Sequence, residues 1–156
     1  MTEIGFYHLQ QTPLERALPK LLEKALERGM RALVVAGSTE RVDQLNPMLW
    51  TYDAASFLPH GTGTDGAEAQ PILLVDNDDN ANGASLLVLL DSTDSERIAD
   101  FERVIDMFDG HDDEAVSAAR QRWKAHKDSG HALTYWQQTE RGGWEKKAEA
   151  NTGDAA

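Results

Sequence analysis

Three uninterrupted apolar segments constrain the fold of this chain most strongly, at residues 32–37, 71–76 and 85–91. A strand with one solvated face alternates apolar and polar residues, so an unbroken apolar run indicates a strand that is buried on both faces. Such strands belong to mostly parallel sheets with helices on both sides. Residues 4–9 and 131–138 predict a first and a last strand. We therefore expect a single three-layer α/β/α domain with a mostly parallel central sheet.

Helical patterns separate these strands, and polar residues that can cap a helix precede them. Thr12 and Glu15 form a capping box before the first pattern, and Thr93 and Glu96 form another before the third. Because proline removes a helical hydrogen bond, Pro47 is expected to end the second helix. The expected helices are residues 12–29, 38–45, 93–110 and 112–130.

Composition limits the class of protein. A chain of 156 residues is the size of one domain, which we expect to span residues 1–144, with a polar, disordered tail at residues 145–156. The absence of cysteine excludes disulfides and thiolate chemistry. No apolar run approaches the ~20 residues of a membrane span, and the first residues show no secretory signal, so a cytoplasmic location is expected. A net charge of -12 opposes direct DNA binding.

A basic cluster interrupts this acidic chain. Arg120, Arg122, Lys124 and Lys127 lie within eight consecutive residues that contain no acid. On a helix, Arg120, Lys124 and Lys127 share one face, and Trp123 lies beside them. A cationic face with an aromatic edge suits a small acidic ligand, whereas a nucleic acid needs a basic domain.

The basic cluster also has a purely structural explanation. Gly130 is expected to end the helix, so the cations lie in its last turns, where the helix dipole favours positive charge. Trp123 is then a core residue. Spacing alone favours this structural explanation.

Two other motifs lack the context that their chemistry requires. Residues 61–66 spell GxGxxG, but a strand follows where a nucleotide-binding loop needs a helix. Residues 78–83 match the first half of a calcium loop, but Leu89 stands where the loop needs a bidentate glutamate. No P-loop, HExxH or GxSxG pattern is present, and the five histidines are not paired at metal-ligand spacing. We therefore expect no metal, cofactor or catalytic residue.

The order of several short motifs resembles the chi subunit of bacterial DNA polymerase III. The resemblance runs from about residue 6 to residue 144 and is carried by residues 6–9 (Phe-Tyr-His-Leu), 49–50 (Leu-Trp), 56–60 (Ser-Phe-Leu-Pro-His) and 119–125 (Ala-Arg-Gln-Arg-Trp-Lys-Ala). It implies a three-layer α/β fold, which the apolar segments predict independently. It also implies an accessory protein of the clamp loader that has no enzymatic activity and no cofactor.

The resemblance further implies two protein partners. Chi-like proteins bind the acidic C-terminal tail of the single-stranded DNA-binding protein, which ends in phenylalanine, and they pair with the psi subunit of the clamp loader. Arg120 would then grip the terminal carboxylate, while Lys124 and Lys127 meet the acidic side chains of the tail. Trp123 and Val116 would line a slot for the terminal side chain.

The remaining expectations concern the edges of these two surfaces. Val116 stands where family members can carry a basic residue, so tail binding is expected to depend more on Lys127 and Arg122. The resemblance places the psi subunit, or a helicase that shares its surface, at Trp50 and Phe57, although both aromatics are equally compatible with a core position. Two alternatives remain open, namely a module that binds acidic peptides outside replication and a small α/β hydrolase with an unrecognised carboxylate site.

Overall fold

One mixed sheet organises the computed structural model, which describes residues 2–51, 58–62 and 66–151. Its strands are β1 (Glu3–Leu9), β2 (Ala32–Val35), β3 (Gly61–Thr62), β4 (Ile72–Val75), β5 (Leu86–Leu89), β6 (Arg103–Asp109), β7 (Ala132–Gln138) and β8 (Trp144–Ala150). The helices are α1 (Leu14–Glu27), α2 (Thr39–Thr51) and α3 (Asp113–Asp128), with short 3₁₀ helices η1 (Ala67–Ala69) and η2 (Ile98–Asp100). Among the described residues, the strand order is β3-β4-β2-β5-β6-β1-β7-β8, and only β7 and β8 pair antiparallel.

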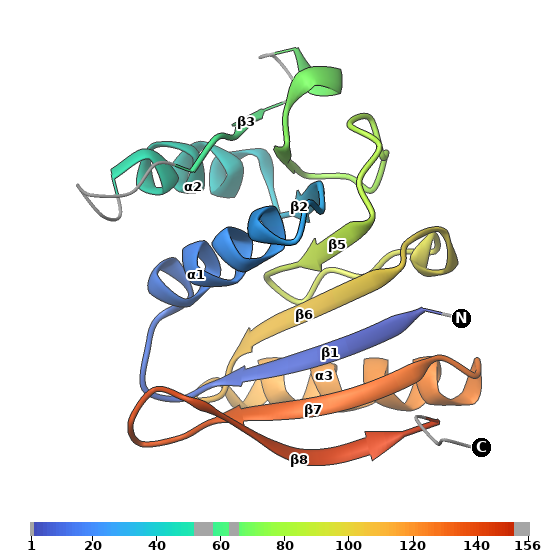
Figure 1. Ribbon diagram of the computed structural model, residues 1–156. Coiled ribbons are helices and arrows are strands. Elements are labelled where there is room, and N and C mark those ends of the chain that lie inside the picture. Colours follow the sequence, from blue (N-terminus) through green and yellow to red (C-terminus); the bar gives the residue numbers. More distant parts are fainter. Residues whose placement is uncertain (1, 52–57, 63–65, 152–156) are drawn as a thin grey trace.

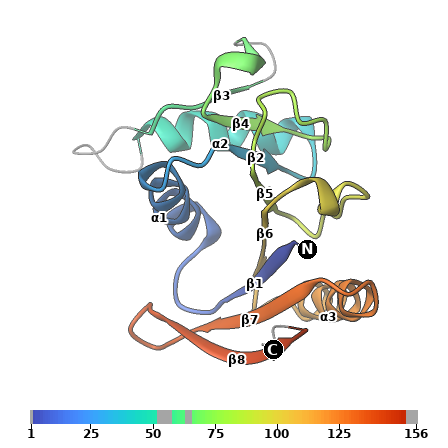
Figure 2. The same cartoon turned by 45° about the vertical axis from the view of Figure 1, so that its right-hand side comes forward.

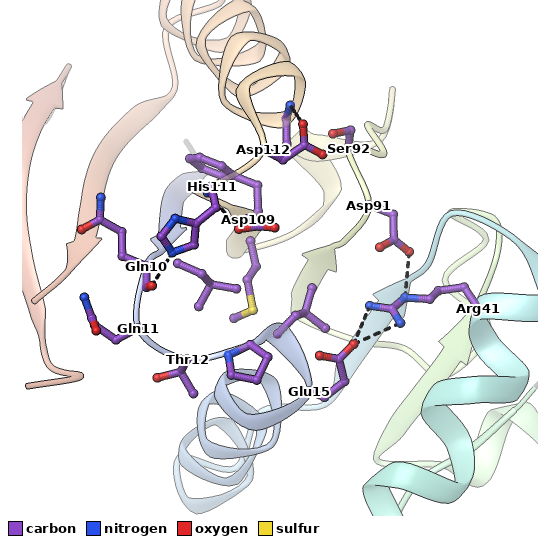
Figure 3. A pocket seen from close by; sticks show the side chains of 16 residues that line it. Gln10, Gln11, Thr12, Glu15, Arg41, Asp91, Ser92, Asp109, His111 and Asp112 are labelled. Carbon is purple, nitrogen blue, oxygen red and sulfur yellow. Dashed lines mark hydrogen bonds and ion pairs between the residues drawn. The ribbon is translucent and has the colours of Figure 1, made fainter. Parts of the chain in front are cut away.

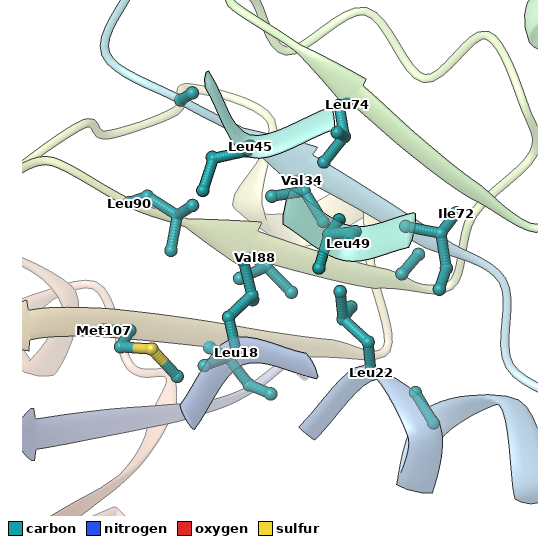
Figure 4. Packing of buried hydrophobic residues seen from close by; sticks show 14 of the residues in the cluster. Leu18, Leu22, Val34, Leu45, Leu49, Ile72, Leu74, Val88, Leu90 and Met107 are labelled. Atoms are coloured by element: carbon teal, nitrogen blue, oxygen red, sulfur yellow. The ribbon is translucent and has the colours of Figure 1, made fainter. Parts of the chain in front are cut away.

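Helices cover both faces of this sheet (Figures 1 and 2). α1 and α2 pack on one face, and α3 packs on the other. In β2, Ala32 and Val34 point into the core beneath α1 and α2, whereas Leu33 and Val35 point into the core beneath α3. Figure 4 shows the first of these cores. The predicted three-layer α/β/α domain with a mostly parallel sheet is confirmed.

The apolar segments form the centre of the sheet, as predicted. All four residues of β2 and all four of β5 are buried, because these strands have neighbours on both edges and side chains on both faces. α1 buries Leu18, Leu22 and Ala25 against the same region, at the spacing expected for one face of a helix.

The predicted helix at residues 93–110 is wrong, because its second half is strand β6. Within that strand Val104 and Phe108 face the α3 side, whereas Ile105 and Met107 face α1 and α2. A strand that is apolar on both faces has no alternation, so its apolar residues also fit a helical period. Only the single turn of η2 precedes it.

The capping box predicted for α1 is also absent. Pro13 occupies the N-cap position in an extended conformation, without a side-chain hydrogen bond to the helix. Thr12 Oγ1 instead accepts a hydrogen bond from Gln138 Nε2 at 2.6 Å. Glu15 forms an ion pair with Arg41, 3.3 Å apart. Both predicted capping residues therefore contact other parts of the fold.

α2 begins as predicted but continues beyond its proline. Ser38 Oγ accepts a hydrogen bond from the Arg41 amide at 3.1 Å, which caps the first turn. Pro47 lies inside the helix, which ends at Thr51. Leu45 and Leu49 are buried on either side of the proline, so packing against the sheet holds both turns in place.

The C-terminal segment is more ordered than its composition predicts. Residues expected to be a disordered tail from position 145 instead belong to β8, which pairs antiparallel with β7. Trp144 anchors the strand by packing edge-on against Tyr7, with ring centroids 5.0 Å apart. Residues 145–150 therefore belong to the sheet and not to a disordered tail, and residues 152–156 lie outside the described part.

Candidate functional site

α3 carries the basic cluster, and its ends are built as the sequence predicts. Asp112 is the N-cap, and its carboxylate accepts hydrogen bonds from the amides of Glu114 and Ala115 at 3.0 and 3.3 Å. Gly130 follows the last turn with a φ of +88°, a left-handed conformation that favours glycine after a helix. Ala119 is fully buried against the sheet and fixes which side of the helix faces inward.

Arg122 does not belong to the exposed cluster. Its guanidinium donates from Nε and Nη2 to the two carboxylate oxygens of Asp106 in β6, at 2.6 and 2.9 Å. Both side chains are buried, and burial raises the pKa of Asp106 while the guanidinium of Arg122 opposes the rise. The expectation that Arg122 adds charge at a surface site therefore does not fit the structure, in which this residue ties α3 to the sheet.

The other three cations face solvent. Arg120, Lys124 and Lys127 are exposed, and within the described part of the chain none of them forms an ion pair. Successive helical residues turn by about 100°, so these three side chains and those of Val116 and Trp123 lie within roughly that angle of one another. The structure thus brings together five of the six residues predicted for this surface.

Trp123 forms the apolar edge of this face. Its ring packs edge-on against Phe6 of β1 and against Tyr135 of β7, with ring centroids 5.4 and 5.9 Å apart. Trp123 and Val116 are both half-buried and pack against the core beneath α3. An apolar ledge therefore lies directly beside the exposed cations.

Two residues at this edge were not predicted from the sequence. Tyr135, in the middle of β7, lies with its hydroxyl oxygen 2.6 Å from Nδ1 of His8, near the carboxyl end of β1. Burial lowers the pKa of His8, and the nearby charges of Arg120 and His111 lower it further, against the opposing effect of Asp109. Burial raises the pKa of Tyr135, whereas Arg120 opposes the rise. The field of Arg120 thus extends to polar groups from two strands, a proximity that only the strand register reveals.

The second predicted surface is only partly described. Trp50 lies in the last turn of α2 and is 46% exposed, so the core position is wrong for this residue. Its ring packs on His60, with ring centroids 4.1 Å apart. The backbone carbonyls of Leu58 and Asn46 hold the two nitrogens of His60 at 2.7 and 2.9 Å. Phe57 lies outside the described residues.

A separate cavity of about 600 Å³ lies where α/β sheets commonly bind ligands (Figure 3). It opens at the carboxyl ends of β1, β5 and β6, and β1 and β6 connect to helices on opposite faces of the sheet. Arg41 is paired there with Glu15 and Asp91, at 3.3 and 3.4 Å. The ionisable groups of its lining are mostly acidic: Glu15, Asp91, Asp109, Asp112, Arg41 and His111.

Beside this cavity, three backbone amides converge at the turn after β1, and the side chain of Gln138 accepts hydrogen bonds from all of them. The amides of residues 10, 11 and 12 all donate to Oε1 of Gln138, at 3.1, 2.8 and 2.9 Å. Converging amides of this kind bind phosphate in nucleotide-binding proteins. Here a buried side-chain amide replaces such a ligand.

In the segment that resembles a calcium loop, asparagine side chains form hydrogen bonds with backbone groups. Asn82 Nδ2 donates to the carbonyls of Ala32 and Gln70, and Asn80 exchanges hydrogen bonds with Ala84. In the described ranges no group of three or more His, Cys, Asp or Glu residues is arranged to hold a metal ion. None of the described helices is both long and apolar enough to cross a membrane.

The described residues thus define a small α/β domain with a cationic, aromatic-edged helix face. Residues 1–134 match the family of the DNA polymerase III chi subunit, HolC, and this match covers most of the chain. The chain therefore belongs to the DNA polymerase III chi subunit family, and the resemblance read from its motifs is confirmed.

Two relatives carry the same name. The chain is 31% identical over 109 residues to the probable DNA polymerase III subunit chi of Rickettsia prowazekii, across 69% of this chain and 66% of that protein, just under two thirds of its length. It is 26% identical over 137 residues to the DNA polymerase III subunit chi of Pseudomonas aeruginosa, across 85% of this chain and 94% of that protein. The family match ends at residue 134, within β7, so β8 lies beyond it.

Proposed function

We propose that this chain is a non-enzymatic adaptor of DNA replication. Its α3 face binds the acidic C-terminal tail of the single-stranded DNA-binding protein, and a second surface joins it to the psi subunit of the clamp loader. The observation that carries the proposal is the set of three exposed cations beside a half-buried tryptophan on one helix face: Arg120, Lys124, Lys127 and Trp123.

The chemistry of this face matches an acidic peptide with an apolar end. Arg120 can hold a terminal carboxylate through two parallel N–H donors, whereas each lysine offers a more mobile point charge for an acidic side chain. Trp123 and Val116 supply the apolar wall for the last side chain of the peptide. Because the rest of the chain is strongly acidic, recruitment acts through this protein partner and not through direct contact with DNA.

The second surface is proposed to centre on Trp50. Its 46% exposure is unusual for a tryptophan and places an aromatic ring at the end of α2, where a partner can cover it. Phe57 follows closely in sequence, and we propose that it belongs to the same psi-binding surface.

Calorimetric titration with a synthetic acidic peptide ending in Pro-Phe tests the proposed tail site. A hydrogen bond to a charged group contributes about 1.5–3 kcal/mol, so Arg120→Ala should weaken binding by roughly tenfold or more. Arg141→Ala is the charge-matched control, because Arg141 is exposed in the turn between β7 and β8, away from α3. Binding should also weaken as salt is raised.

Two outcomes would decide against the proposal. Unchanged affinity in Arg120→Ala would remove α3 as the binding face. Equal affinity for a peptide that lacks the terminal phenylalanine would indicate a general module for acidic peptides, the alternative outside replication.

A further inference from the structure

The sheet face opposite α3 is covered along only part of its width. α1 and α2 pack over the half of the sheet that contains β2, β4 and β5 (Figures 1 and 4). In the described part of the chain, no helix lies over β7, β8 or the first residues of β1 on this face (Figures 1 and 2). The reason is topological, since β7 connects to β8 through a tight turn and not through a crossover helix.

A trough runs along this uncovered face. It consists of two hollows of about 220 and 320 Å³, the first beside α1 and the second over the start of β1. Tyr7, Arg103, Ile105 and Trp136 line both hollows, so the two adjoin. The residues that give the trough its chemistry are Tyr7, Trp136, Trp144, Lys24, Arg28 and Arg103.

Aromatic rings form the floor of the trough. Tyr7 and Trp136 are stacked with ring centroids 6.4 Å apart, and Trp144 meets Tyr7 edge-on at 5.0 Å. The Tyr7 ring lies over Gly5, where a Cβ atom would come within 2.9 Å of its Cε1 atom. The absence of a side chain at position 5 therefore lets the ring lie close to the strand and leaves the trough open above it.

Positive charge lines one side of the trough. Lys24 lies in the last turn of α1, Arg28 is the C-cap residue of that helix, and Arg103 begins β6. None of the described residues lining the hollow beside α1 is acidic. Within the described ranges these three cations form no ion pair. Glu3 lines only the second hollow. In a chain of net charge -12, such a surface selects an acidic partner.

We propose that the trough binds an amphipathic acidic helix of a partner protein. A helix is the element that covers the face of a sheet in a layered domain, and here it would lie beside α1. Its apolar stripe would contact Tyr7, Trp136 and Trp144, and its acidic flank would face the three cations. A nucleic acid fits less well, because three cations do not offset the repulsion of so acidic a chain. The trough lies on the opposite face of the sheet from α3, so an experiment can refute one of the two binding proposals without affecting the other.

Selection from displayed helices tests this proposal with the full-length protein. One library carries helices of about 18 residues, or five turns, with glutamate on the polar flank and a randomised apolar stripe, and a matched library carries lysine instead. We expect enrichment from the glutamate library only. The selected helices should shift the indole N–H resonances of Trp136 and Trp144. Arg28→Glu/Arg103→Glu should weaken their binding at least tenfold, whereas Arg120→Glu should leave it unchanged.

Several results would overturn the proposal. They are enrichment from the lysine library, unchanged affinity in the double variant, loss of binding in Arg120→Glu, or displacement of the selected helices by oligothymidylate. Self-association of the protein that blocks the selected helices would instead assign the trough to a second copy of the chain. Thermal melting of each variant verifies folding, and Lys24→Glu replaces the double variant if that protein unfolds.

Discussion

Removing the buried guanidinium of Arg122 should destabilise the domain without creating a binding defect of its own. In Arg122→Met, the Asp106 carboxylate would lose both hydrogen bonds, of 2.6 and 2.9 Å, at a site where that carboxyl side chain is 3% exposed. Breaking a buried ion pair from one side costs about 3–5 kcal/mol. At about 2–4 °C per kcal/mol for a chain of this size, the melting temperature should fall by about 6–20 °C.

The pH dependence of this loss identifies its cause. Burial already raises the pKa of Asp106, and without Arg122 the pKa should rise further. Because a raised carboxyl pKa favours the folded state only while the group is protonated, the deficit of Arg122→Met should be small in acid and grow as pH rises towards neutrality. Urea unfolding across this pH range measures it, with Arg120→Met as the exposed control. Asp106→Leu/Arg122→Met should recover much of the loss.

A stability loss under about 1 kcal/mol in Arg122→Met, or an equal loss in Arg120→Met, would refute this reasoning. Either result would mean that the contact with Asp106 does not hold α3 on the sheet. Arg122 would then return to the set of candidate surface residues.

Two further predictions follow from the environments of His8 and Trp50. NMR titration should give His8 a pKa below 6.5, so its contribution to folding stability is fully present above that pH and is lost as pH falls towards the folded pKa; Arg120→Ala should raise the pKa, and an unchanged value would contradict the electrostatic link. Trp50→Ala should abolish co-purification with the psi subunit while leaving the melting temperature within a few degrees, because the ring is 46% exposed; a large loss of stability would instead mark a packing role.

The parts of the fold that sequence reasoning predicted are those with a single physical interpretation. Four consecutive apolar residues in β2 are too few for a helix and too apolar for an exposed strand. β6 buries residues on both of its faces, but the apolar residues from Ile98 to Phe108 also recur at a helical period. No local signal in the sequence distinguishes a strand from a helix there. β8 was missed because charged residues dominate an edge strand that gains its hydrogen bonds from β7.

The sequence predicted which residues of α3 form the basic cluster, but it did not predict which of them face solvent and which face the sheet. α3 has few large apolar residues on its inner side, where Ala119, Arg122 and His126 are the buried positions. Without a leucine or isoleucine stripe, the sequence does not indicate which cations face the sheet. Arg122 faces the sheet because its ion-pair partner, Asp106, lies in β6, which the sequence of α3 does not reveal. Tyr135 comes close to the site because β7 pairs with β1.

The side-chain amide of Gln138 limits anion binding at the turn that follows β1. To bind at the turn after β1, a phosphate would first have to expel that buried amide and break its three hydrogen bonds with residues 10–12. At about 0.5–1.5 kcal/mol for each bond, the loss of these three hydrogen bonds would make the binding free energy of a small anion less favourable by several kcal/mol. In many α/β proteins the backbone amides at this end of the sheet hold a cofactor phosphate; here Gln138 already occupies the amides of residues 10–12, although the neighbouring cavity stays open.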